Sequence, residues 1–220
     1  SPSRGLGDVY KRQMLTLYTS PGSCSRASHI ALEEAALDYR PRFVDFAKAD
    51  QTRPDFLAVN PKGRVSALVS DRGVLTEGPA ILAYVAALAP QAALAPADPF
   101  DFARMQAFNL YLASTIHVAH AHGRRAARWS DDPAAQASMA AKVAQNMGAG
   151  FELIEAGLTG DWVMGDAYSV ADPYLFVFSG WLDGDGVDIA RFPRVAAHFQ
   201  RTSQRPAVQR VLAWEAERAR

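Results

Sequence analysis

The sequence predicts an α/β domain followed by an all-α domain. Between residues 14 and 89, short strand-like segments alternate with helix-like segments. Residues 90–99 are rich in proline and alanine, and the pattern beyond residue 100 is helical throughout. We therefore expect an α/β domain over residues 14–89, a linker over residues 90–99 and an all-α domain over residues 100–220.

Residues 1–13 differ in character from the rest of the chain. They carry no apolar periodicity, and a clean strand pattern begins directly after them, at Met14. Residues 8–13 resemble the translation, in one frame, of a transposon-end adapter used in sequencing libraries. We expect residues 1–13 to be either a non-native read-through segment or a disordered tail, outside the fold in both cases.

The elements of the first domain follow in a recognisable order. Residues 15–18 predict a strand, the turn Ser20-Pro21-Gly22 follows, and residues 25–36 predict a helix. A strand over residues 42–46, a short helix near residue 56, a hairpin of residues 65–70 and 74–76, and a helix over residues 80–89 complete the domain. The order βαβ, short helix, ββα fits a thioredoxin-like arrangement.

In the second domain, an apolar stripe recurs every three or four residues from Met139 to Leu158, which is typical of a helix packed on a core. Ser169 and Asp172 have the spacing of a helix N-terminal capping box, so we expect a helix from there through residue 178. Two further helices are predicted over residues 192–200 and 206–217.

Composition narrows the classes of function. The chain of 220 residues holds 23 Lys+Arg, 23 Asp+Glu and one cysteine. Zero formal charge without a basic patch argues against a nucleic-acid partner, and no apolar stretch has the roughly 20 residues that cross a membrane. These two exclusions leave a small molecule as the expected partner. One cysteine cannot form an intramolecular disulfide, so a reducing, cytoplasmic compartment is expected.

Cys24 is the first candidate for chemistry, because it lies where the first helix begins. Unpaired N–H groups and the helix dipole at that end favour a thiolate. The alternative is a small buried hydrophobe, which is the commoner fate of a lone cysteine. Ser25 offers a hydroxyl in the neighbouring position, and the local pattern does not choose between the two residues.

Two further groups of residues are candidates for binding. Glu77 and Gly78 precede a helix, where backbone N–H groups would bind a carboxylate and Glu77 would pair with an ammonium, as an amino-acid head group requires. His117, His120 and His122 cluster on one predicted helix, but without a carboxylate or thiolate at ligand spacing they predict no metal site.

These motifs together resemble a bacterial glutathione transferase, most closely the beta class. The resemblance rests on residues 18–25 (YTSPGSCS), 30–34 (IALEE), 60–65 (NPKGRV), 76–81 (TEGPAI) and 169–172 (SVAD), and it extends from Met14 to the C-terminus. It implies the glutathione transferase fold, a thioredoxin-like N-terminal domain that holds glutathione as co-substrate, a C-terminal all-helical domain that supplies most of the electrophile pocket, and a homodimer.

The resemblance also assigns roles to single residues. It implies that Cys24 faces the glutathione sulfur, that Glu77 and Gly78 bind the γ-glutamyl end, and that His117 lies near the sulfur. Backbone groups at Val65 and Ser66 would pair with the cysteinyl unit. At the position of Ser66 the family has a proline, which follows a cis peptide bond. The Val65–Ser66 bond is therefore expected to be either cis, as in the family, or trans in a loop of different shape.

Two other positions match the family only approximately. The asparagine that reaches glutathione from the neighbouring subunit is represented by Asn109, one residue out of register with the expected position, Leu110. One residue along a helix turns a side chain by about 100°. The lysine in the loop after the second strand is represented by Lys48.

Three functions remain open. The leading hypothesis is a transferase in which Cys24, Ser25 and His117 stabilise the glutathione thiolate, which attacks a hydrophobic electrophile. The second is Cys24-dependent thiol transfer, peroxide reduction or dehalogenation through a mixed disulfide. The third is a non-catalytic binding module. The electrophile pocket is expected to be lined by second-domain side chains: Tyr111, His120, His122 and Trp129.

Overall fold

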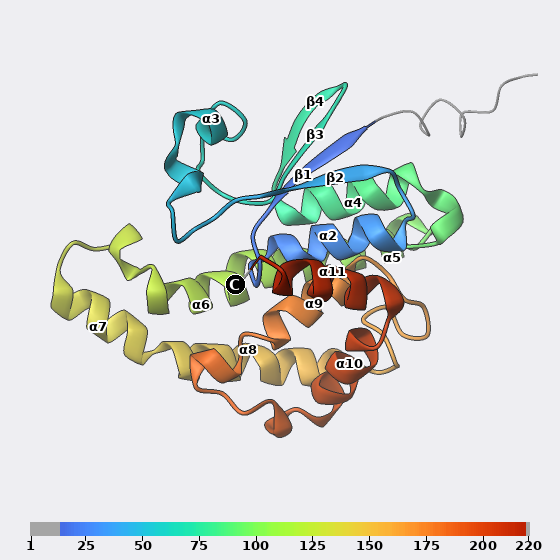
Figure 1. Ribbon diagram of the computed structural model, residues 1–220. Helices are drawn as coiled ribbons and strands as arrows, with labels where there is room; N and C mark the ends of the chain where they lie inside the picture. The colour runs from blue at the N-terminus through green and yellow to red at the C-terminus, as the bar shows by residue number, and fades with distance from the viewer. Residues whose placement is uncertain (1–13, 219–220) are drawn as a thin grey trace, which may run out of the picture. The chain divides into compact units, whose positions relative to one another are not determined.

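The computed structural model describes residues 14–218, so the predictions for residues 1–13 lie outside the described residues (Figure 1). The chain forms two compact units. Unit 1 runs to Pro96 and resumes at Arg205, and unit 2 spans Ala97–Gln204. The first division falls inside the predicted linker at residues 90–99. The second division was not predicted from the sequence.

Unit 1 is built on a four-stranded sheet in the order β2-β1-β3-β4. Its strands are β1 (Leu15–Thr19), β2 (Tyr39–Phe43), β3 (Ala67–Ser70) and β4 (Gly73–Thr76). β1 and β2 are parallel, whereas β3 runs antiparallel to both β1 and β4. The βαβ unit followed by a hairpin is the thioredoxin-like order, so the predicted fold class is confirmed.

One strand lies elsewhere than predicted. The sequence predicts residues 42–46, but β2 pairs Tyr39 with Leu15 and ends at Phe43. β2 is an edge strand with no fully buried residue, so its apolar alternation is weak, and Pro41 is tolerated there because an edge strand has one unpaired side.

The helices of unit 1 cover the sheet and supply the rest of its core. α2 (Ser25–Glu34) and α4 (Gly78–Leu88) lie side by side on one face (Figure 1), and their apolar residues Ile30, Leu32, Ile81 and Leu82 are fully buried. The short segments are η1 (Asp50–Thr52), α3 (Pro54–Leu57) and η2 (Pro90–Ala92).

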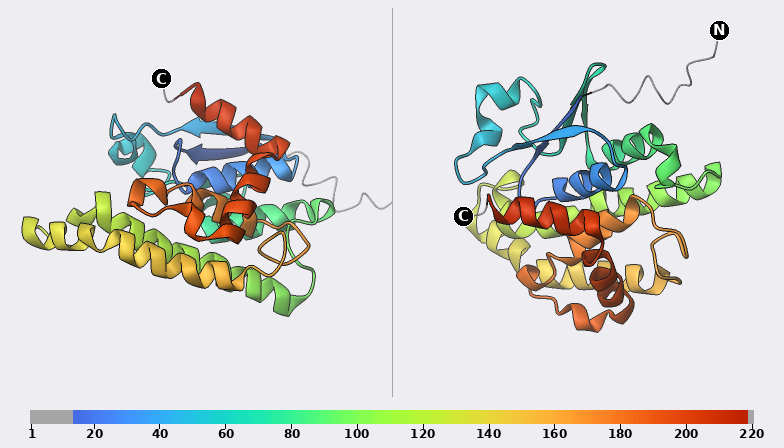
Figure 2. Two further views of the ribbon diagram at one scale, coloured as in Figure 1. Left: turned by 90° about the horizontal axis from the view of Figure 1, so that it is seen from below. Right: turned by 45° about the vertical axis from the view of Figure 1, so that its right-hand side comes forward.

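The last helix, α11 (Pro206–Ala216), belongs to unit 1, which corrects the prediction that residues 100–220 form one all-α domain. It packs on α2 (Figure 2, right). Three ion pairs join the two helices or the residue before α11: Arg205 to Glu34, Arg210 to Glu33, and Arg26 to Glu215. Contacts between residues this far apart in the chain leave no local signal in a sequence.

Unit 2 is all helical, as predicted. Its α-helices are α5 (Pro99–Tyr111), α6 (His117–Arg124), α7 (Pro133–Ala141), α8 (Val143–Gly157), α9 (Ala171–Ser179) and α10 (Pro193–Ser203). Its shorter segments are η3 (Leu112–Ile116), η4 (Ala126–Arg128), η5 (Asp183–Asp185) and η6 (Ile189–Arg191). Every residue of α9 is buried, so this helix forms the centre of the unit.

The apolar stripe predicted as one helix is divided between two helices. Met139 lies on α7, which has no buried residue, and the chain turns at Lys142 before α8 begins. The stripe from Val143 onward is buried in α8, as its spacing predicts, and Leu158 caps the end of the helix.

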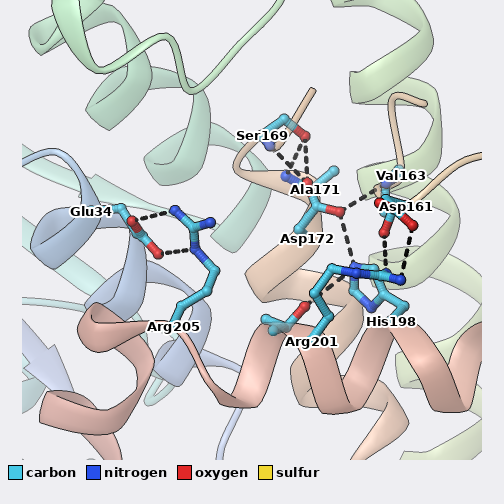
Figure 3. A network of polar contacts seen from close by, with 10 residues as sticks. Glu34, Asp161, Val163, Ser169, Ala171, Asp172, His198, Arg201 and Arg205 are labelled. Carbon is cyan, nitrogen blue, oxygen red and sulfur yellow. Dashed lines mark hydrogen bonds and ion pairs between the residues drawn. The ribbon is translucent and has the colours of Figure 1, made fainter. Parts of the chain in front are cut away.

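A buried carboxylate holds the start of α9 in place (Figure 3). Asp172 is fully buried, and one of its oxygens accepts hydrogen bonds from the backbone N–H (2.7 Å) and the hydroxyl (3.2 Å) of Ser169. The other oxygen accepts the Val163 N–H at 2.8 Å and is bonded to His198 Nε2 at 2.9 Å. The predicted capping box is present, and it also ties α9 to α10.

Within unit 1, His29 is a buried titratable group between α2 and α11. It is 2% exposed, and its ring meets those of Tyr39 and Trp214 edge to face at 5.5 and 4.9 Å. Burial lowers the pKa of His29 to about 4; nearby Glu33 opposes this change and Arg218 adds to it. The imidazole is therefore neutral in the folded protein at pH 7.

We expect this histidine to make the fold acid-sensitive. A folded-state pKa below the unfolded value means that the unfolded chain binds the extra proton, so stability is complete above pH 6.5 and falls as the pH drops toward 4. Between pH 7 and pH 4.5 the wild type should lose about 2 kcal/mol more unfolding free energy than His29→Gln, measured by urea denaturation. His122→Gln, which removes a partly exposed histidine, should keep the wild-type loss. Equal losses in the wild type and His29→Gln would contradict the assignment.

Candidate functional site

Cys24 lies between β1 and α2, at the position predicted for it. The chain leaves β1 at Thr19, turns through Gly22 with a positive φ of 69°, and enters α2 directly after Cys24. Its side chain is partly exposed, and the thiol donates a hydrogen bond to the carbonyl oxygen of Val65 at 3.5 Å. Cys24 is therefore placed at a helix N-terminus and within reach of solvent, unlike a buried structural cysteine.

Ser25 has a different environment. It is fully buried, and its Oγ lies 2.8 Å from Thr19 Oγ1 and 2.6 Å from Ser23 Oγ, while accepting the N–H of Ser20 at 3.1 Å. These three contacts close the turn that precedes α2. The structure thus places Ser25 as a support of the loop, while Cys24 is the residue with an accessible reactive atom.

The same loop is held from the C-terminal helix by a residue that the sequence did not point to. Glu215 on α11 is 4% exposed, and its Oε2 accepts the N–H of Gly22 at 3.2 Å and the Arg26 side chain at 2.9 and 2.5 Å. The carboxylate therefore contacts the chain two residues before and two residues after Cys24. Nothing in the local sequence of α11 signals this role.

The Val65–Ser66 segment lies beside the start of α2. The peptide bond between the two residues is cis, which is the first of the two alternatives considered for it. Ser66 is 4% exposed, and its hydroxyl lies 3.0 Å from that of Ser28 on α2. The loop before it is shaped by the buried Asn60, whose side chain donates to Arg64 O at 2.6 Å and accepts from Lys62 N at 3.2 Å.

Glu77 and Gly78 begin α4, and a lysine joins them there. Glu77 has a positive φ of 74°, and its exposed carboxylate forms an ion pair with Lys62, whose Nζ also lies 2.9 Å from Thr76 Oγ1. The Glu77 side chain makes no capping hydrogen bond to the N–H groups that begin this helix. Lys62 was quoted in the motif of residues 60–65 but was not predicted to be a site residue.

Lys48 is exposed and bonded elsewhere. Its Nζ lies 3.2 Å from Asp45 Oδ2, and this contact lowers the pKa of the Asp45 carboxyl. The lysine side chain is 76% exposed, so the pair is weak and Lys48 can change partner.

In unit 2, His117 and His120 gather around one aromatic side chain, Trp181. The His117 ring lies 5.2 Å from that of Trp181 and 5.6 Å from that of Phe178, and the His120 ring stacks on Trp181 at 4.2 Å. His120 Nδ1 is bonded to both oxygens of Asp185, at 2.9 and 2.7 Å. The sequence predicted the two histidines but missed Trp181 and Asp185, which follow α9.

The other predicted pocket residues contact different neighbours. The His122 ring packs on that of Trp129 at 4.3 Å, and Trp129 is 47% exposed. The Tyr111 hydroxyl donates to Gly150 O at 3.3 Å, and burial raises the pKa of this tyrosine. The four residues expected to line one pocket are therefore not brought together by contacts within unit 2.

Asn109 lies in the core of unit 2. It is fully buried on α5 and donates to Gln106 Oε1 at 3.1 Å, whereas its neighbour Leu110 is 55% exposed. Because successive residues of a helix point about 100° apart, the offset of one position turns the amide into the core. Its role toward glutathione of a neighbouring subunit stays a prediction.

Residues 14–218 contain no group of three or more His, Cys, Asp or Glu side chains with the geometry to hold a metal ion. No helix there has both the length and the apolar character to span a membrane.

The geometry defines a class of protein. Within unit 1, a thiol lies at one helix N-terminus and a paired carboxylate and ammonium lie at another, on a thioredoxin-like sheet. These groups of unit 1 can bind a peptide-like thiol. Within unit 2, two imidazoles pack on an aromatic side chain.

Comparisons with known proteins agree with this class. Residues 13–87 match the N-terminal domain family of glutathione S-transferases. The chain is 32% identical over 206 residues to glutathione S-transferase GstA of Escherichia coli O157:H7, covering 91% of this chain and 98% of GstA. The chain therefore belongs to the glutathione S-transferase family.

Solved structures show the same likeness. A glutathione transferase homologue from Sulfitobacter with bound glutathione is 50% identical and has a TM-score of 0.88, over 90% of this chain and 96% of the homologue. A bacterial beta class glutathione S-transferase from Sphingomonas chungbukensis is 36% identical and has a TM-score of 0.80, over 91% of this chain and 98% of its own.

Proposed function

We propose that the protein is a glutathione S-transferase that joins the thiolate of glutathione to hydrophobic electrophiles, in a detoxifying role in the cytoplasm. Family membership and the glutathione bound in the Sulfitobacter homologue support the co-substrate. The single cysteine supports a reducing compartment.

The observation that carries the proposal is the charge arrangement at the start of α4. Glutathione ends in an amino-acid group that bears one ammonium and one carboxylate. Glu77 is an anion for the ammonium, while Lys62 and the N–H groups of α4 are donors for the carboxylate. Because both side chains are largely exposed, a zwitterion can replace their mutual ion pair at little cost.

The sulfur of glutathione would then lie toward Cys24. The backbone groups of Val65 and Ser66 would pair with its cysteinyl unit, and Lys48 would be a partner for the glycyl carboxylate. The Cys24 thiol lies 3.5 Å from Val65 O and can donate a hydrogen bond to it, which supports a role beside the glutathione thiolate. The family resemblance implies a role for His117 near the sulfur, and within unit 2 the ring of this histidine packs on Phe178 and Trp181.

Calorimetric titration of reduced glutathione into the full chain tests the proposal. We expect saturable binding, weakened about tenfold in Glu77→Gln because a neutral amide loses about 1.4 kcal/mol of attraction for the ammonium. Glu152→Gln, which changes an exposed carboxylate paired with Arg191, should bind as the wild type does. No saturation up to ten millimolar would mean a binding free energy weaker than about −3 kcal/mol. That result would contradict the transferase assignment and leave a non-catalytic binding module.

Replacing Cys24 separates the two kinds of chemistry. In Cys24→Ala, conjugation of chlorodinitrobenzene should persist within about threefold, since the nucleophile belongs to glutathione, whereas thiol transfer to a mixed disulfide should be lost. The partial exposure of the Cys24 thiol is what keeps thiol transfer as the second candidate. Loss of both activities in Cys24→Ala, with glutathione binding intact, would instead make Cys24 the nucleophile.

We also propose that the protein is a homodimer. Exposed apolar side chains on unit 2 support this proposal. Phe100 and Leu110 on α5 and Leu153 on α8 are 73%, 55% and 67% exposed. Leu153 also lines an apolar pocket of about 240 Å³ between these helices, with Phe108, Tyr111, Ile154, Gly157, Leu158 and Val163. Large exposed apolar side chains beside an apolar pocket favour a surface that another protein covers.

We expect Leu153→Glu to weaken the dimer. A carboxylate in an apolar interface loses its hydration without gaining a partner, so sedimentation velocity at micromolar concentration should show monomers. Ala137→Glu, at an exposed position on α7, should sediment as the wild type does. A Leu153→Glu protein that remains fully dimeric would place the interface elsewhere.

A further inference from the structure

An ion pair lies beside Cys24, and all of its atoms belong to unit 1. Glu215 Oε2 is 2.5 Å from Arg26 Nη2 and 2.9 Å from Arg26 Nε, and it accepts the Gly22 N–H at 3.2 Å. Gly22 and Arg26 are each two residues from Cys24, and two residues span about 7 Å at most. The charges of Arg26 and Glu215 therefore lie close to the thiol.

Little water screens these two charges. The side chain of Glu215 is 5% exposed and that of Arg26 is 19% exposed. The guanidinium reaches back over the turn, because a Cβ atom placed on Gly22 would lie 3.9 Å from Arg26 Nη2. Partly buried charges are screened much less than exposed ones, so each member of the pair acts on the ionisation of the Cys24 thiol.

The Glu215 carboxylate is bonded through one oxygen only. Its Oε1 is buried and has no hydrogen-bond partner among residues 14–218. A buried oxygen without a partner lowers stability, so hydrogen bonding alone does not account for a carboxylate at this position. What the carboxylate adds to its hydrogen bonds is a negative charge beside the thiol loop.

We propose that Glu215 is a positioning residue that raises the pH at which the Cys24 thiol ionises. The carboxylate offsets the Arg26 cation, which alone would favour the thiolate, as the N-terminus of α2 does. A nearby anion disfavours a second anion, so the sign of the effect follows from the charges.

The consequence for glutathione chemistry rests on the proposed function. In thiol transfer, the Cys24 thiolate would attack one sulfur of a disulfide, and the other sulfur would leave as a thiolate with the electron pair of the broken bond. Only the ionised thiol starts this reaction. Glu215 therefore limits thiol transfer through Cys24 and favours conjugation, in which the sulfur of glutathione is the nucleophile.

The pH dependence of Cys24 alkylation tests the proposal directly. Cys24 is the single cysteine of the chain, so thiol alkylation by iodoacetamide reports on this residue alone. Rates measured from pH 5.5 to pH 9 on the full chain, without glutathione, give the midpoint of thiol ionisation. Further charged or titratable side chains on the segments around the thiol loop stay the same in every variant: Lys62, Arg64, Glu77, Arg218 and His29.

Removing each charge in turn should move the midpoint in opposite directions. Glu215→Gln keeps an oxygen that can accept the Gly22 N–H but leaves Arg26 without its anion. The midpoint should fall, with about three times more thiolate one pH unit below the wild-type midpoint. In Arg26→Gln the carboxylate is left without its cation, so the midpoint should rise. The double variant, which has lost both charges, should return close to the wild-type midpoint.

Glu34→Gln is the matched control. Glu34 also forms an ion pair from α2 to the C-terminal segment, with Arg205 (Figure 3), and its side chain is 11% exposed. It lies at the far end of α2, about 15 Å along the helix from Cys24, which is beyond the screening length in physiological salt. This variant loses a comparable ion pair and should keep the wild-type midpoint.

Opposite shifts in the two single variants, cancelled in the double variant, support the proposal. Shifts of the same sign would show a loosened loop and overturn it, and so would no shift or an equal shift in Glu34→Gln. If Arg26→Gln does not fold, a fall of the midpoint in Glu215→Gln that the double variant fails to reverse overturns the proposal. Because alkylation needs no glutathione, a wild type that fails to bind glutathione contradicts the proposed function separately.

Discussion

A buried carboxylate fixes the loop that carries the reactive thiol. Glu215 accepts the Gly22 N–H and the Arg26 guanidinium, so one acceptor holds the chain on both sides of Cys24. A buried carboxylate is costly unless it is bonded, and here the 4% exposed Glu215 is bonded through Oε2 to a backbone N–H and to a guanidinium that is 19% exposed. Because Gly22 and Glu215 are 193 residues apart, the thiol loop depends on the last helix of the chain.

In unit 2, Asp172 is the buried carboxylate that holds separate chain segments together. It accepts two backbone N–H groups, from Val163 and Ser169, and holds His198 on a neighbouring helix. In both units a carboxylate replaces water for backbone groups that no helix or strand satisfies. The Arg26 guanidinium offsets the charge of Glu215, and His198 is hydrogen-bonded to Asp172. The imidazole cluster around Trp181, which follows α9, is thereby tied to the fully buried helix of its unit.

The parts of the fold that were predictable from the sequence are those with local signals. The turn and helix start around Cys24, the break before Gly78 and the capping box at Ser169 each lie within a few residues. Glu215, Lys62 and Asp185 were missed because their roles depend on partners distant in the sequence. Asn109 shows the other limit, since one residue of offset on a helix decides whether a side chain is exposed, as Leu110 is, or buried, as Asn109 is.

Ser66 departs from the proline that the family resemblance implies, and the structure compensates for the change. A buried hydroxyl without a partner is destabilising, but the Ser66 hydroxyl lies 3.0 Å from that of Ser28, one turn into α2. Cys24, at the start of the same helix, bonds to the adjacent residue, Val65. Two consecutive residues of the loop are thus fixed to α2, so the serine adds a contact at the place where the cysteinyl unit of glutathione would bind. The paired hydroxyl therefore fits serine into the packing of this loop, where the family has proline.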